Sequence, residues 1–203
     1  MRFLRNNGLS IALFLLFTGS VVGMVWSGWQ QQNQELRLHA QPLLSLMEYL
    51  YDETFWSALF ENWESEWLQM ATYVVLTAYL FQKGSSESRD PDKAKKEPEP
   101  ASSGSWIYDH SLGLTLVFLF VLSFSGHFFA SLAAYNSQAA AHGEAARTPA
   151  SYLANAQFWF ESFQNWQSEF FSTAMLVVLS IFLRYRGSPE SKKVPASNEE
   201  TGG

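Results

Sequence analysis

The chain has 203 residues and a formal net charge of −6, so it lacks the basic surplus that nucleic-acid binding requires. It contains no cysteine, which excludes disulfides, thiolate metal sites, iron–sulfur clusters and a cysteine nucleophile. Aromatic residues make up 16% of the chain and charged residues another 16%, and the apolar residues gather into four blocks, which is typical of a membrane protein.

The first apolar block runs from Leu9 to Trp29. At about 1.5 Å per helical residue, it is long enough to cross a hydrocarbon core of about 30 Å. Arg2 and Arg5 precede it, so it also fits a signal peptide. A block of similar length recurs inside the chain, from Leu112 to about Ala134, and an internal copy cannot be a removed leader. We therefore predict that both blocks are retained spanning helices.

The second and fourth blocks are shorter. Trp67–Gln82 and Phe170–Leu183 correspond to only about 24 and 21 Å of helix, which is short for a membrane span. Each follows an aromatic segment that is compatible with a helix. We predict one long helix per half that starts amphipathic at the interface and continues into the bilayer, with Trp at the headgroup level. The predicted fold is an all-α integral membrane protein with four transmembrane helices.

The chain also repeats itself. Asn62 and Glu66 belong to the motif Phe-x-Asn-Trp-x-Ser-Glu, which recurs 103 positions later at Asn165 and Glu169, and both copies end in Gly-Ser-x-Glu-Ser. A duplication predicts two tandem helical hairpins. The units are residues 1–83 and 106–186. The linker 84–105 and the tail 187–203 are rich in polar and charged residues, and we predict that both are disordered.

Basic residues predict the orientation. Of the 13 Lys and Arg residues, only Arg37 and Arg147 lie in the two connections, near residues 30–66 and 134–169. Because cytoplasmic loops carry the basic excess, both termini and the linker should be cytoplasmic. Both hairpins then share one orientation, related by a pseudo-two-fold axis along the membrane normal.

The repeated motif is a candidate polar boundary site formed by Asn62, Glu66, Asn165 and Glu169. On a helix, Asn and Glu four residues apart share a face. Two such faces could bind a cation or relay a proton, because ionisable residues near the bilayer are costly and often functional. Alternatively, these side chains only fix the helix entry and face headgroup water. Neither glutamate has a His or Asp nearby at metal-ligand spacing, so we predict no metal site here.

Histidines offer further candidates. His39 and His142 are repeat-equivalent and lie in the connections, where they could share a metal only if the connections converge. His127 lies inside the third block and corresponds to Met24, a pair that a haem could use as axial ligands. A lone intramembrane His more often bonds a neighbouring helix. We predict no cofactor and no metal.

Small residues recur in the first and third blocks. In lipid, close approach of backbones drives helix association, so these residues are candidate packing positions. They are Gly19, Gly23, Ser27, Gly126 and Ala130. The contact could be made within one chain, in a homo-oligomer or with another membrane protein. The bilayer itself is the other expected partner.

Three features resemble a family of small bacterial membrane proteins defined as domain of unknown function 6766. They are the opening Phe3-Leu4-Arg5-Asn6-Asn7-Gly8-Leu9-Ser10, both Phe-x-Asn-Trp-x-Ser-Glu motifs and both Gly-Ser-x-Glu-Ser ends. The resemblance implies a multi-pass protein of the bacterial inner membrane, with no established reaction, substrate or cofactor. Such sequences favour His-Gly in both connections. His142-Gly143 fits this pattern, and His39-Ala40 departs from it.

The sequence carries no Gly-x-Ser-x-Gly, His-Glu-x-x-His, phosphate-binding loop or dinucleotide fingerprint, so no catalytic residue is predicted. Our first hypothesis is a non-enzymatic membrane protein that acts through helix packing and partner contacts. The alternative is a small transporter or channel subunit that uses Glu66 and Glu169. A membrane enzyme is the third.

Overall fold

The computed structural model describes residues 2–94 and 101–202. Helices account for 72% of the described residues, which contain no strand. The predicted all-α class is therefore confirmed. Lys95 and Lys96, which belong to the basic run of the predicted linker, lie outside the described residues.

Four of the helices in the described residues are long. They are α1 (Arg2–Leu38), α3 (Glu53–Tyr79), α6 (Ser111–Ala141) and α8 (Ala156–Phe182). Short helices lie between them: α2 (Leu46–Tyr51), α4 (Pro91–Ala94), α5 (Trp106–Asp109) and α7 (Pro149–Tyr152). As predicted, α3 and α8 each run unbroken through one copy of the Phe-x-Asn-Trp-x-Ser-Glu motif.

Two of the long helices, α1 and α6, are long and apolar enough to cross a membrane. The sequence predicted four such spans. By length and composition, two of the helices in the structure qualify. The other two, α3 and α8, begin with acidic and amide side chains, and only their second halves are apolar. This polar first half is what separates them from α1 and α6.

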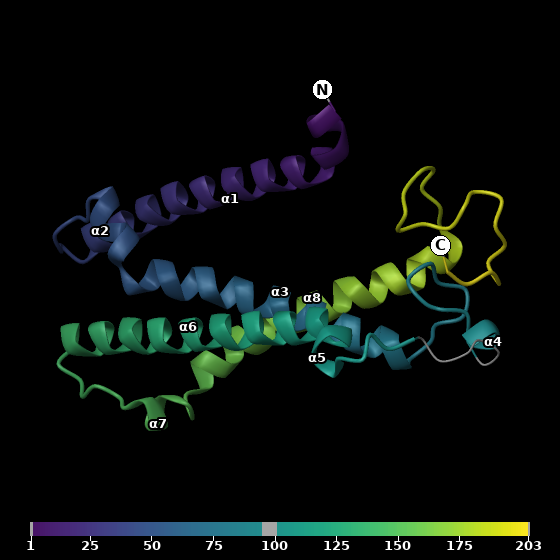
Figure 1. Ribbon diagram of the computed structural model, residues 1–203. Coiled ribbons are helices and arrows are strands. Elements are labelled where there is room, and N and C mark those ends of the chain that lie inside the picture. The colour runs from purple at the N-terminus through teal and green to yellow at the C-terminus, as the bar shows by residue number, and fades with distance from the viewer. Residues whose placement is uncertain (1, 95–100, 203) are drawn as a thin grey trace.

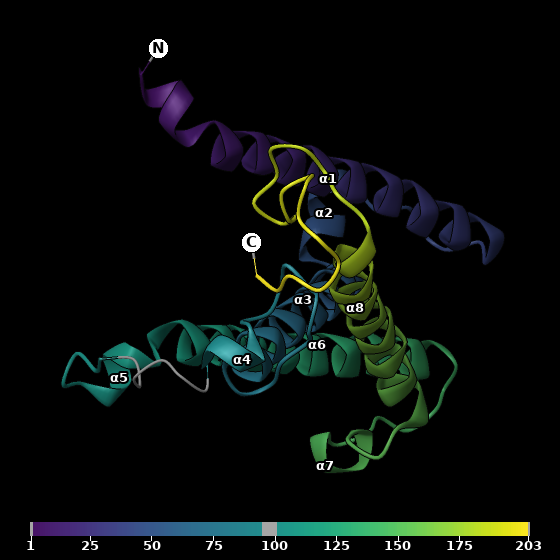
Figure 2. The same cartoon turned by 90° about the vertical axis from the view of Figure 1, so that its right-hand side faces the viewer.

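The helices are not arranged as two separate hairpins. Figures 1 and 2 show α3 running alongside α6, with α8 crossing them, while α1 splays away from the other three. The helix α3 of the first predicted unit packs against both α6 and α8 of the second. The carboxyl-terminal half of α1 approaches α2 and α3, where Trp29 and Met24 pack against a small core. Nearer the middle of α1, the Phe17 ring lies 6.5 Å from that of Trp63 in α3, between ring centroids. The two units therefore interlock through α3.

Both connections are closed by the same contacts. The side chain of Asn33 accepts from the backbone N–H of Leu44 at 2.8 Å and donates to its carbonyl at 2.9 Å. Asn136, 103 positions later, makes the same pair of bonds with Arg147, at 2.7 and 3.0 Å. These paired bonds satisfy backbone N–H and C=O groups that would otherwise lack a hydrogen-bond partner in the loop.

The helices that follow the connections begin with matching caps. Ser45 and Thr148 each form a capping box at the start of α2 and α7. Asp52 and Asn155 then cap α3 and α8 by accepting a backbone N–H two residues on. These polar caps explain why the predicted amphipathic helices break into a short and a long piece.

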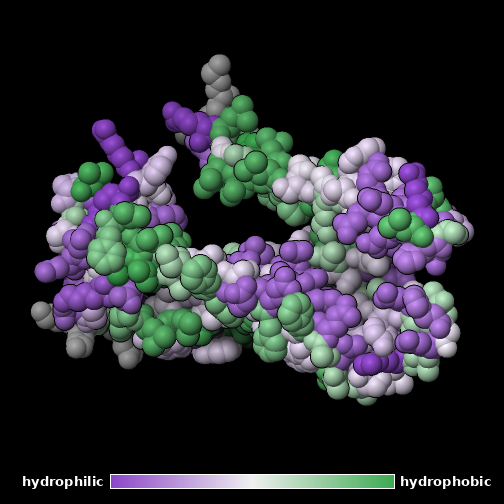
Figure 3. All heavy atoms as spheres, turned by 180° about the vertical axis from the view of Figure 1, so that it is seen from behind, coloured by the Kyte–Doolittle hydropathy of each residue, from purple (hydrophilic) through white to green (hydrophobic). Residues whose placement is uncertain are grey.

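Two small apolar cores lie beside these caps, one in each half. Their buried members are Tyr49, Phe55 and Leu59 in the first, and Leu132, Tyr152 and Phe158 in the second. Most other large apolar side chains are exposed. Figure 3 shows one group of them on the amino-terminal arm of α1, where Leu9 is 76% exposed.

The first part of the predicted linker lies against α8 and the tail. The backbone N–H of Gly84 donates to Thr201 Oγ1 at 2.8 Å, and the hydroxyls of Ser85 and Ser180 lie 2.8 Å apart. The disorder predicted for the linker and the tail stays a prediction.

Candidate functional site

A buried histidine and a buried glutamate meet where α3, α6 and α8 come together. His127 of α6 and Glu64 of α3 both have fully buried side chains, and His127 Nδ1 lies 3.0 Å from Glu64 Oε2. The other oxygen of Glu64 accepts from Trp166 Nε1 of α8 at 3.2 Å. A carboxylate can only accept, so Nδ1 of His127 must donate to it. Both oxygens of Glu64 are thus bonded.

The opposite edge of the His127 ring faces two further carboxylates. Its Nε2 lies 3.8 Å from Glu161 Oε2 of α8 and has no hydrogen-bond partner. A ligand atom from each of Glu61, His127 and Glu161 lies within 4.8 Å of the other two. We refer to Glu61, Glu64, His127 and Glu161 as the polar junction.

Three helices place these side chains. Glu61 and Glu64 are three residues apart on α3 and therefore share a face. Asn165, one turn beyond Glu161 on α8, donates to Glu61 Oε1 at 2.5 Å. On α6, Gly126 lets the helix approach α3 closely, because a Cβ there would lie 2.7 Å from the Phe60 ring. This close approach brings the neighbouring His127 to the carboxylates.

The junction carries more negative than positive charge. Three carboxylates surround one imidazole, so a negative surplus remains even when the imidazole is protonated. In the described part of the chain, no Lys or Arg forms an ion pair with any of the three. Burial of an unpaired charge costs on the order of several kcal/mol for each ion. The junction therefore favours any positive ion that can reach it.

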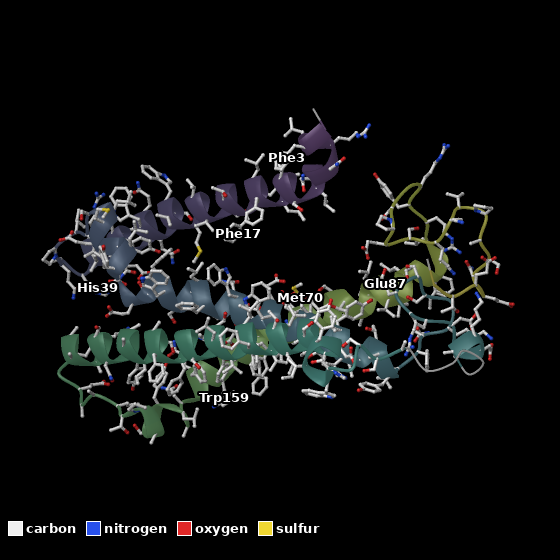
Figure 4. The ribbon with its side chains drawn as sticks, in the orientation of Figure 1. Phe3, Phe17, His39, Met70, Glu87 and Trp159 are labelled. Atoms are coloured by element: carbon white, nitrogen blue, oxygen red, sulfur yellow. The ribbon has the colours of Figure 1, made fainter. Side chains whose placement is uncertain are left out.

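A cavity of about 1010 Å³ leads to the junction from the two connections. We call it the connection cavity. Glu161 lines one part of it, and the carboxyl-terminal ends of α1 and α6 line another. His39 and His142 both line it, so the two connections converge on one space; Figure 4 shows His39 at this end of α1.

The walls of the connection cavity are acidic. Its lining includes Glu35, Asp52, Glu53 and Glu161, and none of the lining residues is Lys or Arg. Tyr152 also lines it, with its hydroxyl 2.8 Å from Ser131 Oγ. Burial raises the pKa of Tyr152, so this hydroxyl stays neutral at physiological pH. The walls therefore attract cations.

The structure brings two of the predicted boundary residues, Glu66 and Glu169, near each other and outside the junction. Glu66 is exposed, and the partly buried Glu169 lies close enough to it for the two carboxylates to repel each other. Asn62 donates back to its own helix, at Ala58 O. Of the four predicted residues, only Asn165 contacts the junction. Neither Glu66 nor Glu169 lines the connection cavity.

The predicted packing residues differ between the two copies. Gly126 lies directly against Phe60, and the nearby Ala130 is partly buried. Gly19 and Gly23 have no atom within 4 Å of where a Cβ would lie. Ser27 bonds its own helix, at Gly23 O. In the first copy it is instead Gly28 that is approached closely, by the Tyr49 hydroxyl.

Sequence reasoning missed the junction because it looked for identities between the copies. The junction residues are where the copies differ: Glu61, Glu64, His127 and Glu161 correspond to Gln164, Gln167, Met24 and Ala58. His127 was considered as a haem ligand opposite Met24 or as a lone histidine that bonds a neighbouring helix, and not together with the acids of α3 and α8. The sequence did hold a signal for the junction: ionisable residues that occur in only one of the two repeats. Such residues are not needed for the fold that the two repeats share, so they indicate a separate role.

Family comparison agrees with the motifs. The family model described as Domain of unknown function (DUF6766) matches residues 1–203. The chain belongs to this family. No curated protein and no solved structure matched the sequence. For this DUF6766 protein, the function must therefore be argued from the polar junction and its surroundings.

Proposed function

We propose that this DUF6766 protein is a non-enzymatic, multi-pass protein of the bacterial inner membrane that binds a cation at the polar junction. One observation carries the proposal: three carboxylates gather around a single imidazole, and the neighbouring cavity has acidic walls. Bound cations satisfy such groups in proteins, and intramembrane ionisable residues commonly mark ion pathways.

The exposed apolar surface supports the membrane setting. The arm of α1 would be unstable in water, since Phe3, Leu9 and Leu16 are each more than half exposed there. In a bilayer, α1 and α6 span, and the apolar second halves of α3 and α8 supply the other two spans. The polar first halves of α3 and α8 then lie toward the connections.

Orientation follows from the basic residues. With the termini cytoplasmic, the connection cavity opens on the outer side of the membrane. A cation from that side meets Glu35 and Glu53 before it reaches Glu161. This route favours the junction over Glu66 and Glu169 as the cation site of a small transporter or channel subunit.

A single substitution tests the proposal. Glu61→Gln keeps the oxygen that accepts from Asn165 and removes one of the clustered charges. In detergent micelles, with a chelator and at low salt, we expect this variant to be more stable than the natural chain by about 1 kcal/mol, as occurs when a strained functional site is relieved. We also expect it to lose the stabilisation that added cations give.

Thermal unfolding of the full chain measures both effects. Glu66→Gln is the matched control, because it removes an exposed carboxylate from the same helix and leaves the junction intact. If Glu61→Gln destabilises the chain, or behaves like Glu66→Gln, the carboxylates of the junction serve packing and the proposal is wrong.

A second candidate function, action through partner contacts, rests on the splayed arm of α1. Figure 4 shows Phe3 at the far end of this arm, and the Phe17 ring lies 6.5 Å from that of Trp63 in α3, between ring centroids. The free sides of the arm leave room for a helix of another copy or of another membrane protein. Crosslinking from position 14, where Phe14 is 70% exposed, tests this contact.

A further inference from the structure

The ring nitrogen Nε2 of His127 is the least satisfied polar atom of the junction. The side chain is fully buried, and Nε2 has no hydrogen-bond partner. Because Nδ1 donates to Glu64, Nε2 of the neutral ring presents a lone pair. The groups it faces, Glu61 and Glu161, are acceptors when ionised, so they cannot donate to it. A buried acceptor that faces acceptors needs a positive charge between them, which either a proton on Nε2 or a bound metal ion supplies.

We propose that His127 Nε2, Glu61 and Glu161 bind a divalent transition-metal ion. The inference rests on the proposed cation-binding function and names the class of cation. Metal–nitrogen and metal–oxygen bonds of about 2.0–2.2 Å place tetrahedral ligands roughly 3.3–3.6 Å apart. The three ligand atoms already lie within 4.8 Å of one another. Small rotations of the two partly exposed glutamates close the difference.

The surrounding side chains match those of histidine metal sites. A metal-bound histidine usually donates its other nitrogen to a carboxylate, and Glu64 receives this bond from His127. The ligating carboxylates are also held: Asn165 donates to Glu61, and Gln157 donates to Glu161 at 2.9 Å. These bonds orient all three ligands before an ion arrives.

The donor set determines which ions fit. An imidazole nitrogen with two carboxylates suits Zn²⁺, Mn²⁺ or Fe²⁺, whereas Ca²⁺ and Mg²⁺ take oxygen ligands and usually more of them. The chain has no cysteine, so a thiolate site for Cu⁺ is excluded. In a four-coordinate Zn²⁺ site, three protein ligands leave one coordination position open. Glu161 lines the connection cavity, so this position is accessible from there.

Only one such site can form in each chain. The equivalents of the three ligands in the other repeat are Gln164, Met24 and Ala58, which supply no carboxylate and no imidazole. Binding should therefore saturate at one ion per chain, although the scaffold is duplicated. A site built from residues shared by both copies would instead bind two.

The test uses the full chain in detergent after chelator treatment, titrated in separate experiments with ZnCl₂, MnCl₂, CaCl₂ and MgCl₂. Calorimetry gives affinity and stoichiometry, and thermal unfolding gives stabilisation. His39→Gln with His142→Gln serves as the background, so that these cavity histidines cannot bind the metal. We expect Zn²⁺ or Mn²⁺ to bind at one ion per chain.

Variants of the junction distinguish the outcomes. Glu161→Gln should weaken binding more than about tenfold, and Glu64→Gln by about 10- to 100-fold through the orientation of His127. His127→Gln should abolish binding; if it does not fold, Glu161→Gln carries the test. The control Glu66→Gln should bind like the background chain.

Three results would overturn the inference. If Zn²⁺ and Mn²⁺ bind equally well to Glu161→Gln, the ion lies elsewhere. If only Ca²⁺ or Mg²⁺ stabilises the chain, and Glu61→Gln removes that stabilisation, the transition-metal inference fails while the proposed cation-binding function stands. If no cation stabilises the background chain, both are wrong.

Discussion

At the scale of single residues, the duplication exposes one strained position. Ala40, two residues after the end of α1, has φ = 52°, in the left-handed region, and its equivalent Gly143 adopts φ = 72° two residues after α6. A Cβ in this region costs roughly 1–2 kcal/mol, which glycine avoids. We predict that Ala40→Gly stabilises the chain by about 1 kcal/mol, as measured by thermal unfolding in micelles.

The reverse change at the equivalent position is its control. Gly143→Ala has open space around it, so any effect comes from the backbone alone, and we expect a loss of similar size. Equal stability of Ala40→Gly and the natural chain would show that the turn after α1 does not hold this conformation.

At the scale of elements, close packing of α6 on α3 depends on Gly126. A methyl group there would meet the base of the Phe60 ring, which cannot move without disturbing α3. We predict that Gly126→Ala destabilises the chain by about 1–3 kcal/mol, the usual cost of overpacking, and displaces His127 from the carboxylates. Thermal unfolding and the metal titration both measure this change.

The repeat supplies the matched control for this helix contact. Gly23 is the equivalent residue in α1 and has nothing within 4 Å of a Cβ position. Gly23→Ala should be neutral or stabilise α1 by up to about 1 kcal/mol through helix propensity. If both substitutions destabilise equally, the cost arises in the helices themselves and packing against Phe60 is not its cause.

The sequence was enough to predict the elements but not their pairing. Apolar length and aromatic spacing predicted α1, α6 and the long helices through Asn62 and Asn165. Which faces meet depends on contacts between distant segments, such as Phe60 against Gly126, and periodicity carries no information about them. The site was missed for the same reason: Glu61, His127 and Glu161 are distant in sequence and come together only because α3 packs with the other unit.

At the scale of the whole molecule, interlocking turns a duplicated scaffold into an asymmetric one. The first copy contributes acids from α3, and the second contributes an imidazole from α6 and an acid from α8. The α1 helix of the first copy contributes no residue to the junction. Because the two sequence repeats differ at these four positions, the described residues form one such junction.

The proposed membrane orientation gives the last prediction, because it decides from which side a cation enters. The natural chain has no cysteine, so single cysteines report without background. We place one at the exposed Glu144 in the second connection and one at the exposed Ser197 in the tail. A maleimide that cannot cross the inner membrane should label Glu144→Cys in intact cells. It should label Ser197→Cys only after lysis, because basic residues keep that side cytoplasmic.

Two outcomes would contradict this arrangement. Labelling of Ser197→Cys in intact cells would reverse the orientation and place the connection cavity on the cytoplasmic side. Recovery of the chain in the soluble fraction would rule out the membrane setting.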